Sequence, residues 1–421
     1  MEQLACMGGL PACPAGTIPT WPNYDHREMA ALERVLHSGK WWRGSGEEVE
    51  AFEREFAEFH DCAHALAVCN GTQALEISLS CLGVGLGDEV IIPAFTFVAT
   101  AGAPLTIGAI PVPVDIDPET YTIDVTAVRG AITSRTRAII PVHLAGGPCE
   151  MDALGDVSRA AGVPIVSDAA HAHGARWKGT SLAALSLVSI YSFQSVKLLT
   201  AGEGGALVTN DTELARHAWL KHTYGRPKGD RRYQHLELGT NSRMTEFQGA
   251  MLRVQLARFS GQLREREDGA ARLDEILGRV DGIDVAKRFA GTSVHSHYMY
   301  MIRLREKIGI RRDTLVDALV AEGVPAFRAY PAIPDLEMFR ETRFRDEQVT
   351  LRLKPDAVRE GLNRHAVPAA RAIAEESIWL HHAVLLGGPK VQESVAHAFL
   401  KVITQKSRLA AREHALSTTA G

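Results

Sequence analysis

Lys197 is the residue whose position in this sequence most strongly indicates chemistry. It lies in SFQSVKLLTAGEGG (192–205), directly after the apolar run VSIYSF (188–193), which is typical of a buried strand. A lysine in such a place can form a Schiff base with an aldehyde. Desolvation lowers its pKa toward the range in which the amine is a nucleophile and then a proton carrier. The glycine-rich exit (202–205) leaves room for a bulky group. A surface lysine is the alternative interpretation.

Asp168 is the second candidate, at the end of the apolar run VPIVSD (163–168). An aspartate at the end of a buried strand needs a partner, and a protonated ring nitrogen of a cofactor would keep it ionised. A helix cap or an ordinary ion pair is the alternative. The sequence HAH (171–173) has no third ligand at suitable spacing, so we expect no metal site.

Gly71, Thr72 and Phe97 also follow apolar runs. Gly71 and Thr72 open a predicted helix after HALAVC (64–69), where free N–H groups favour an anion such as phosphate. An ordinary helix cap is the alternative for this segment. Phe97 follows DEVIIP (88–93) by four residues, so its flat ring could stack on another flat ring, with core packing as the alternative.

These candidates all follow strands, and the carboxyl ends of parallel strands meet at one edge of a sheet. Together they provide an anion cradle, a carboxylate for a ring nitrogen, a stacking ring and a Schiff-base lysine. Those are the parts needed to hold pyridoxal 5′-phosphate and to use it as an electron sink. The sequence therefore predicts this cofactor.

An alternation of apolar runs with helical segments, from about residue 64 to 210, must position these residues. Uninterrupted apolar runs indicate strands buried on both faces, so the pattern predicts an α/β fold with a mainly parallel sheet. After residue 210 longer helical patterns take over. We expect an N-terminal arm and large cofactor-binding domain over 1–261 and a smaller C-terminal α+β domain over 262–421, with the polar stretch 343–365 as a surface excursion.

Composition excludes several classes of protein. The chain has 421 residues, 46% of them hydrophobic and 23% charged, with a formal net charge of −4. This charge gives no reason to expect nucleic acid or an anionic membrane as a partner. The six cysteines form no C-x-x-C pair, and neither a leader nor a membrane-spanning run is evident. We expect a cytoplasmic protein.

Several motifs in their order resemble one family. NGTQALEISLSCLGVGLGDEVIIPAFTF, DAAHAHGA, SFQSVKLLTAGEGGALVT and TNSRMTEFQGAMLRVQL look like the DegT/DnrJ/EryC1/StrS aminotransferases, over about residues 21–400. The resemblance implies the fold-type-I architecture of aspartate aminotransferase, with a large and a small domain. It makes Lys197 the lysine that bonds the cofactor aldehyde and Asp168 the partner of the pyridine nitrogen.

The remaining site residues follow from the same resemblance. Phe97 takes the position that stacks on the ring, and His171 takes that of a residue near the ring. Gly71, Thr72 and Ser192 take phosphate-binding positions. Asn241 resembles a residue that reaches the phosphate of the neighbouring subunit, which implies a homodimer with shared active sites. Ser242 replaces an aromatic residue that many members carry.

Within the family, HSHYMYMIRL, PAFRAY and WLHHAVLLG look most like the 3-amino-5-hydroxybenzoate synthases and next like the cyclitol aminotransferases of aminoglycoside pathways. This implies amino transfer from glutamine or glutamate to a cyclic ketone of dehydroshikimate type, giving an aminobenzoate. A keto-cyclitol or keto-sugar is the alternative acceptor. Ser195-Val196 stands where those synthases commonly carry Asn-Gly before the lysine, and this difference bears on the substrate.

Two other classes of function are alternatives to an aminotransferase. A sugar dehydratase of this family would replace the lysine with histidine, and a binding protein without turnover could lose Lys197 or Asp168. Both residues are present, which favours the aminotransferase.

Four further residues are candidates for lining the acceptor pocket, with a structural role as the alternative: Arg328, Tyr330, His297 and Tyr224.

Overall fold

The structure, a computed structural model, describes residues 2–340 and 355–411. The α-helices are α1 (His26–Ser38), α2 (Glu48–Phe59), α3 (Gly71–Cys81), α4 (Ala99–Thr106), α5 (Val125–Ala131), α6 (Met151–Ala161), α7 (Thr212–His222), α8 (Glu246–Leu277), α9 (Arg312–Ala321), α10 (Glu337–Arg340), α11 (Pro355–Asn363), α12 (Pro368–Glu376) and α13 (Pro389–Thr404). Short 3₁₀ turns connect some of them, among them η8 (His382–Leu385).

The strands fall into a central sheet and smaller ones. They are β1 (His64–Val68), β2 (Glu89–Pro93), β3 (Ile110–Val114), β4 (Thr136–Ile139), β5 (Val166–Asp168), β6 (Arg176–Trp177), β7 (Thr180–Ser181), β8 (Val188–Ser192), β9 (Gly205–Thr209), β10 (Ile283–Val285), β11 (Thr292–Val294), β12 (Met299–Leu304), β13 (Ala326–Arg328) and β14 (Ser377–His381).

The central sheet is mainly parallel, as predicted. Strands β3, β2 and β4 pair in parallel, as do β5 and β8, and parallel bridges such as Val142–Asp168 join the two groups. Every residue of β2 and β3 is buried, because helices cover both faces of such a sheet. The sequence pattern did not show that β9 runs antiparallel to both β8 and β1.

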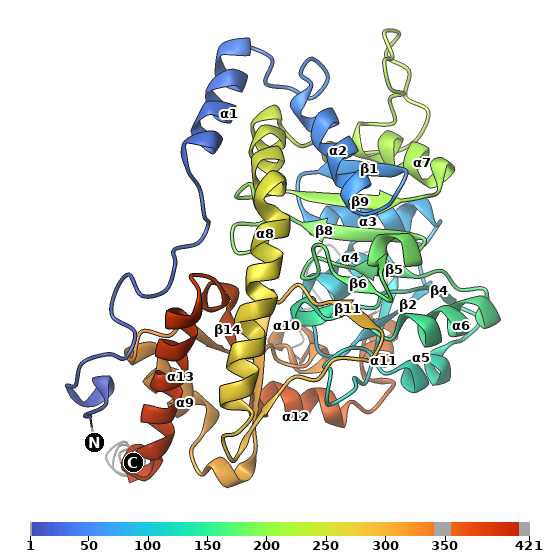
Figure 1. The fold of residues 1–421 in the computed structure, drawn as a ribbon. Coiled ribbons are helices and arrows are strands. Elements are labelled where there is room, and N and C mark those ends of the chain that lie inside the picture. The colour runs from blue at the N-terminus through green and yellow to red at the C-terminus, as the bar shows by residue number, and fades with distance from the viewer. Residues whose placement is uncertain (1, 341–354, 412–421) are drawn as a thin grey trace.

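Helix α8 connects two hydrophobic cores. Its first half packs against α1 and α2, and its second half packs against α13 and η8 (Figure 1). Leu252 and Phe259 of α8 belong to the core of the central sheet, whereas Leu273 and Leu277 belong to a second core. The second core includes the antiparallel sheet β10-β12-β14-β13 with α9 and α13. The predicted boundary at residue 261 lies within α8, and the division into two domains stays a prediction.

The polar stretch 343–365 lies partly outside the described residues, which resume at 355. From there α11 packs against β3, with Val358 and Leu362 buried, so a surface excursion is wrong for this part. Two apolar residues four positions apart place one helix face in the core, although most of the segment is polar. No helix in the described part of the chain is long and apolar enough to cross a bilayer.

We expect replacement of two glycines of α8 by alanine to change the stability of the protein in opposite directions. A Cβ on Gly249 would lie 2.7 Å from the Val49 main-chain nitrogen, whereas a Cβ on Gly261 would meet nothing within 4 Å. Alanine gains about 1 kcal/mol of helix propensity over glycine at either position. We expect Gly261→Ala to raise the free energy of unfolding, and Gly249→Ala to lower it by about 1–3 kcal/mol because of overlap with α2. Denaturant titration measures both, and equal stabilisation by the two variants would contradict this packing.

Candidate active site

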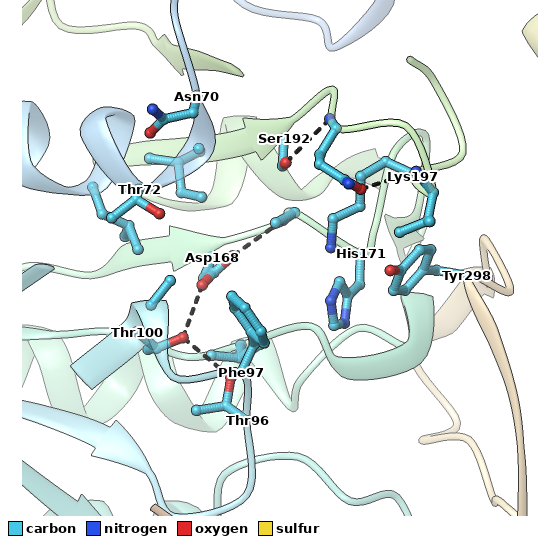
Figure 2. Close-up of a pocket in the computed structure, with 18 of the residues that line it drawn as sticks. Asn70, Thr72, Thr96, Phe97, Thr100, Asp168, His171, Ser192, Lys197 and Tyr298 are labelled. Atoms are coloured by element: carbon cyan, nitrogen blue, oxygen red, sulfur yellow. Dashed lines mark hydrogen bonds between the residues drawn. The ribbon is translucent and has the colours of Figure 1, made fainter. Parts of the chain in front are cut away.

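A cavity of about 410 Å³ lies at the edge of the central sheet where β1, β5 and β8 end. It brings together seven of the predicted site residues, which come from separate segments of the chain (Figure 2). These residues are Gly71, Thr72, Phe97, Asp168, His171, Ser192 and Lys197. The alternation of strands and helices therefore predicted this convergence correctly.

Lys197 lies in a turn after β8, in which its N–H donates to the carbonyl oxygen of Gln194 at 2.8 Å. The Nζ atom lies over the ring of Tyr298, 4.3 Å from the ring centre. Desolvation by the surrounding protein lowers the pKa of Lys197 from 10.5 to about 8, against the opposing effect of the Asp168 carboxylate. A large fraction of this amine is therefore neutral near pH 8 and can act as a nucleophile.

Asp168 is buried at the end of β5 and accepts two hydrogen bonds. The Ala170 N–H donates to Oδ1 and the Thr100 hydroxyl donates to Oδ2, each at 3.1 Å. The Thr96 hydroxyl lies 3.1 Å from that of Thr100 and extends this network. Burial raises the pKa of Asp168, while the two hydrogen bonds and the charge of Lys197 oppose the rise. A cationic group bound in the cavity would keep this carboxylate ionised.

The start of α3 lies against the end of β8. Asn70 caps the helix by accepting from the Gln73 N–H at 2.8 Å. A Cβ on Gly71 would lie 3.0 Å from the Ser192 Cβ, a tight contact that glycine avoids. Helix N–H groups and the Thr72 and Ser192 side chains thus line one side of the cavity, which suits an anion.

The glycines after Lys197 have a role that the sequence did not indicate. A Cβ on Gly205 would overlap the Asn70 main chain, because antiparallel β9 begins at the edge where β1 and β8 end. Gly205 therefore makes room for the neighbouring main chain. Gly204 has a φ of 155°, a backbone conformation that residues with a side chain rarely adopt. The expectation that the whole segment leaves space for a ligand is therefore wrong for Gly205.

Two flat side chains face the cavity. Phe97 is 52% exposed, so core packing does not explain it, and its ring lies 5.9 Å from that of Tyr330. His171 stacks on Tyr298 with ring centres 4.2 Å apart, and its Nδ1 has no hydrogen-bond partner in the described protein. Burial and the nearby charge of Lys197 hold the pKa of His171 well below its usual value, so the ring is neutral.

Asn241 does not belong to this cavity within one chain. It is exposed and pairs through its main chain with Thr223, at the base of the loop that projects between α7 and α8 (Figure 1). Ser242, its neighbour, is fully buried.

Of the weaker candidates for the acceptor pocket, Tyr330 lines the cavity. Arg328 instead pairs with Asp313 and Asp317, and His297 lies against Arg288 in a separate small cavity. Tyr224 is 46% exposed and is absent from the cavity wall that the described residues form.

Sequence reasoning missed several residues of the cavity wall. Tyr298 and Trp379 come from the C-terminal part of the chain, and Thr100 lies one turn after Phe97 on α4. No local pattern marks Tyr298 or Trp379, because only the folded chain brings their segments to the sheet edge. Thr100 carried a usable signal, since it follows a strand end by the same logic that selected Phe97.

Comparison with known proteins shows similarity over most of the chain. The family model of the DegT/DnrJ/EryC1/StrS aminotransferase family matches residues 22–399. The chain is 46% identical over 391 residues to a 3-amino-5-hydroxybenzoate synthase of Amycolatopsis mediterranei, covering 92% of this chain and 97% of that protein. It is 36% identical to an L-glutamine:2-deoxy-scyllo-inosose aminotransferase of Streptomyces fradiae, covering 93% and 96%.

Solved structures show the same relationship. The crystal structure of 3-amino-5-hydroxybenzoic acid synthase superposes with a TM-score of 0.83 at 44% identity, covering 92% of this chain and 99% of that one. DesV of S. venezuelae, solved in complex with a ketimine intermediate, gives a TM-score of 0.78 at 34% identity, with 90% of this chain and 94% of that one covered. The match extends over nearly the whole chain, and the protein therefore belongs to the DegT/DnrJ/EryC1/StrS aminotransferase family.

Proposed function

We propose that this aminotransferase uses pyridoxal 5′-phosphate to transfer an amino group to a cyclic ketone of dehydroshikimate type, and that loss of water from the ring then gives an aminobenzoate. The observation that carries the proposal is the partly neutral amine of Lys197, with a pKa of about 8, in a cavity that also holds a buried carboxylate and a helix start. The similarity to a 3-amino-5-hydroxybenzoate synthase over 92% of the chain supports the substrate class.

The residues of the cavity fit this cofactor. Gly71, Thr72 and Ser192 would hold its phosphate at the start of α3, where Gly71 lies close to the end of β8. Asp168 would pair with the protonated ring nitrogen. This positive partner would keep the buried carboxylate ionised. Phe97 would stack on the ring, because its own ring is exposed to the cavity and not packed in the core. His171, neutral and with a free Nδ1, would lie near the ring.

Each residue then has a defined task. Bound pyridoxal phosphate supplies an electron sink for the charge that develops at the amino-bearing carbon. Lys197 would hold the cofactor through its amine, and Nζ would take and return a proton at the reacting carbon. Asp168 would keep the ring nitrogen protonated and so would favour the charged transition state. In the aminobenzoate reaction, Nζ would also remove the proton that accompanies loss of water.

A keto-cyclitol is the second candidate acceptor, with glutamine or glutamate as the amino donor for either acceptor. Among the described residues of the cavity wall, Lys197 is the one cation, whereas Asp168 and Glu203 are anionic. Hydroxyl and amide groups of Thr96, Ser192, Gln194, Tyr298 and Tyr330 also line it. Such a wall suits a ring that carries hydroxyl groups and no carboxylate. The similarity to glutamine-dependent inosose aminotransferases supports this alternative.

We also propose a homodimer in which Asn241 reaches the phosphate in the neighbouring subunit. Its exposure, outside its own chain's cavity, leaves it free to do so. Trp41 and Trp42, each 52% exposed, are large apolar side chains that a second copy could cover.

The acidity of Lys197 can be measured without the cofactor. We expect acylation of Lys197 in the cofactor-free protein to rise with pH to a plateau with a midpoint near pH 8, because only the neutral amine reacts. In Asp168→Asn the midpoint moves to lower pH, because the carboxylate charge that raises the pKa is gone. Peptide mass spectrometry resolves the site, and a midpoint near 10.5 in the unmodified chain would contradict a desolvated lysine.

A cofactor-binding test follows from the close approach of α3 to β8. Gly71→Ala places a Cβ 3.0 Å from Ser192, and we expect the dissociation constant for pyridoxal phosphate to rise about tenfold or more. Gly85→Ala is the matched control, since its Cβ would meet nothing within 4 Å. Absorbance titration gives both constants. Equal affinity in the two variants would remove the start of α3 from the proposed phosphate site.

The reaction itself is tested by mass-resolved product analysis with pyridoxal phosphate and glutamine. A dehydroshikimate-type ketone and a keto-cyclitol are supplied separately, and Lys197→Ala serves as the inactive control. An aromatic aminobenzoate establishes the first candidate, and an aminated ring that stays saturated establishes the second. If neither glutamine nor glutamate gives up its amino group, the proposal is wrong.

A further inference from the structure

Arg266 of α8 is a buried cation that forms no salt bridge with any residue that the structure describes, although the charge of Glu265 acts on it. Its side chain is 0% exposed, and in the described protein Nη1 and Nη2 have no hydrogen-bond partner. Desolvation lowers its pKa from 12.5 to about 9, which reflects the cost of keeping this charge away from water. A buried guanidinium that forms no ion pair contributes poorly to stability, so its presence calls for another explanation.

Two hydrogen bonds connect Arg266 to the segment that carries Lys197. Arg266 Nε donates to Nδ1 of His382 at 3.4 Å, and Nε2 of His382 lies 3.3 Å from the carbonyl oxygen of Val196. Val196 is the residue directly before Lys197. Trp21 of the N-terminal segment closes the cluster, since its ring lies 5.1 Å from the Arg266 guanidinium and edge-on to His382 at 4.5 Å.

The guanidinium decides the tautomer of His382. Arginine can only donate, so Nδ1 of His382 must present its lone pair. The ring is neutral, because burial and the charge of Arg266 hold the pKa of His382 well below its usual value. Its one proton therefore lies on Nε2 and is donated to the Val196 carbonyl oxygen. Without Arg266 the proton could move to Nδ1, and Nε2 would then turn a lone pair toward that oxygen.

This donation fixes the peptide that leads into Lys197. On the other side, the Val196 N–H donates to Oε1 of Gln194 at 2.9 Å, and the Lys197 N–H donates to the Gln194 carbonyl oxygen at 2.8 Å. Val196 is 41% exposed, so packing of its own side chain does little to hold this turn. Leu198 and Leu199 are buried and hold the turn after Lys197, whereas the bond from His382 links the peptide before Lys197 to the protein interior.

We propose that Arg266 and His382 are positioning residues that hold the Lys197 amine against Tyr298 and toward the cavity. The proposal rests on the proposed function of Lys197 and adds the means by which its direction is set. Arg266 acts through His382 and the Val196 carbonyl, and it contacts neither the substrate nor the cofactor. Burying the charge of Arg266 costs free energy. In return, the contact favours one orientation of the Lys197 side chain and does not stabilise the fold as a whole.

The test compares stability with the reactivity of Lys197 in the full-length chain. Arg266→Met removes the charge and the donor, and His382→Leu removes the ring. We expect each to slow capture of pyridoxal phosphate on Lys197, trapped with borohydride and quantified by peptide mass spectrometry, by about tenfold or more. The melting temperature of Arg266→Met should be unchanged or raised, because a buried unpaired charge is gone.

Three further variants make the test specific. The double variant Arg266→Met/His382→Leu should react no more slowly than His382→Leu alone, because both changes break the same hydrogen bond. His382→Gln, whose amide can donate to the Val196 carbonyl oxygen, should restore most of the rate. Arg264→Met, an exposed arginine on the same helix, should leave the rate unchanged.

Two results would overturn the proposal: rates that stay at the level of the unmodified chain while melting temperatures fall, or effects of the two single variants that multiply in the double variant. Acylation of Lys197 in the cofactor-free protein is measured in parallel and should slow in the same variants. If the unmodified chain captures no pyridoxal phosphate, the proposed function fails, while the acylation rates still decide whether Arg266 and His382 position the amine.

Discussion

The site depends on two opposite charges, Lys197 and Asp168, buried in one cavity. Burial disfavours the charged form of both Lys197 and Asp168, lowering the pKa of the first and raising that of the second, and each charge partly offsets the effect on the other. Asp168 is stabilised further by Thr100 and the Ala170 N–H. An arrangement of this kind costs free energy in the empty protein, and that cost is offset when a group with complementary charges binds.

The order of strands serves this arrangement. Parallel strands bring their carboxyl ends to one edge, which places Asp168 at the end of β5 beside the turn that follows β8. Antiparallel β9 then returns along β8 and begins at that same edge, where Gly205 passes close to Asn70. The main chains of β1, β8 and β9 therefore meet at the start of α3, where Gly71 and Gly205 make close contacts.

The sequence predicted those features that depend on local pattern. Strand ends identified Asp168 and Lys197, because alternation of apolar runs with helices fixes which strand ends share an edge. Partners that come from distant segments, such as Tyr298 over the lysine, were not predictable, since no spacing along the chain encodes that contact. Arg266 was missed for a related reason: within a long amphipathic helix an arginine looks like part of the solvated face, and only packing against η8 shows that it is buried. The cavity brings most of these residues together, but every role assigned to them stays a prediction: Lys197, Asp168, Gly71, Thr72, Phe97, His171, Ser192 and Asn241.

Helix α8 also has a mechanical consequence. Its 32 residues, a rod of about 48 Å at 1.5 Å per residue, contribute side chains to both hydrophobic cores. A continuous helix contains no hinge, because a sharp bend would break its main-chain hydrogen bonds. Helix α8 therefore fixes the orientation of the two cores relative to each other. Rotating one core against the other would cost free energy.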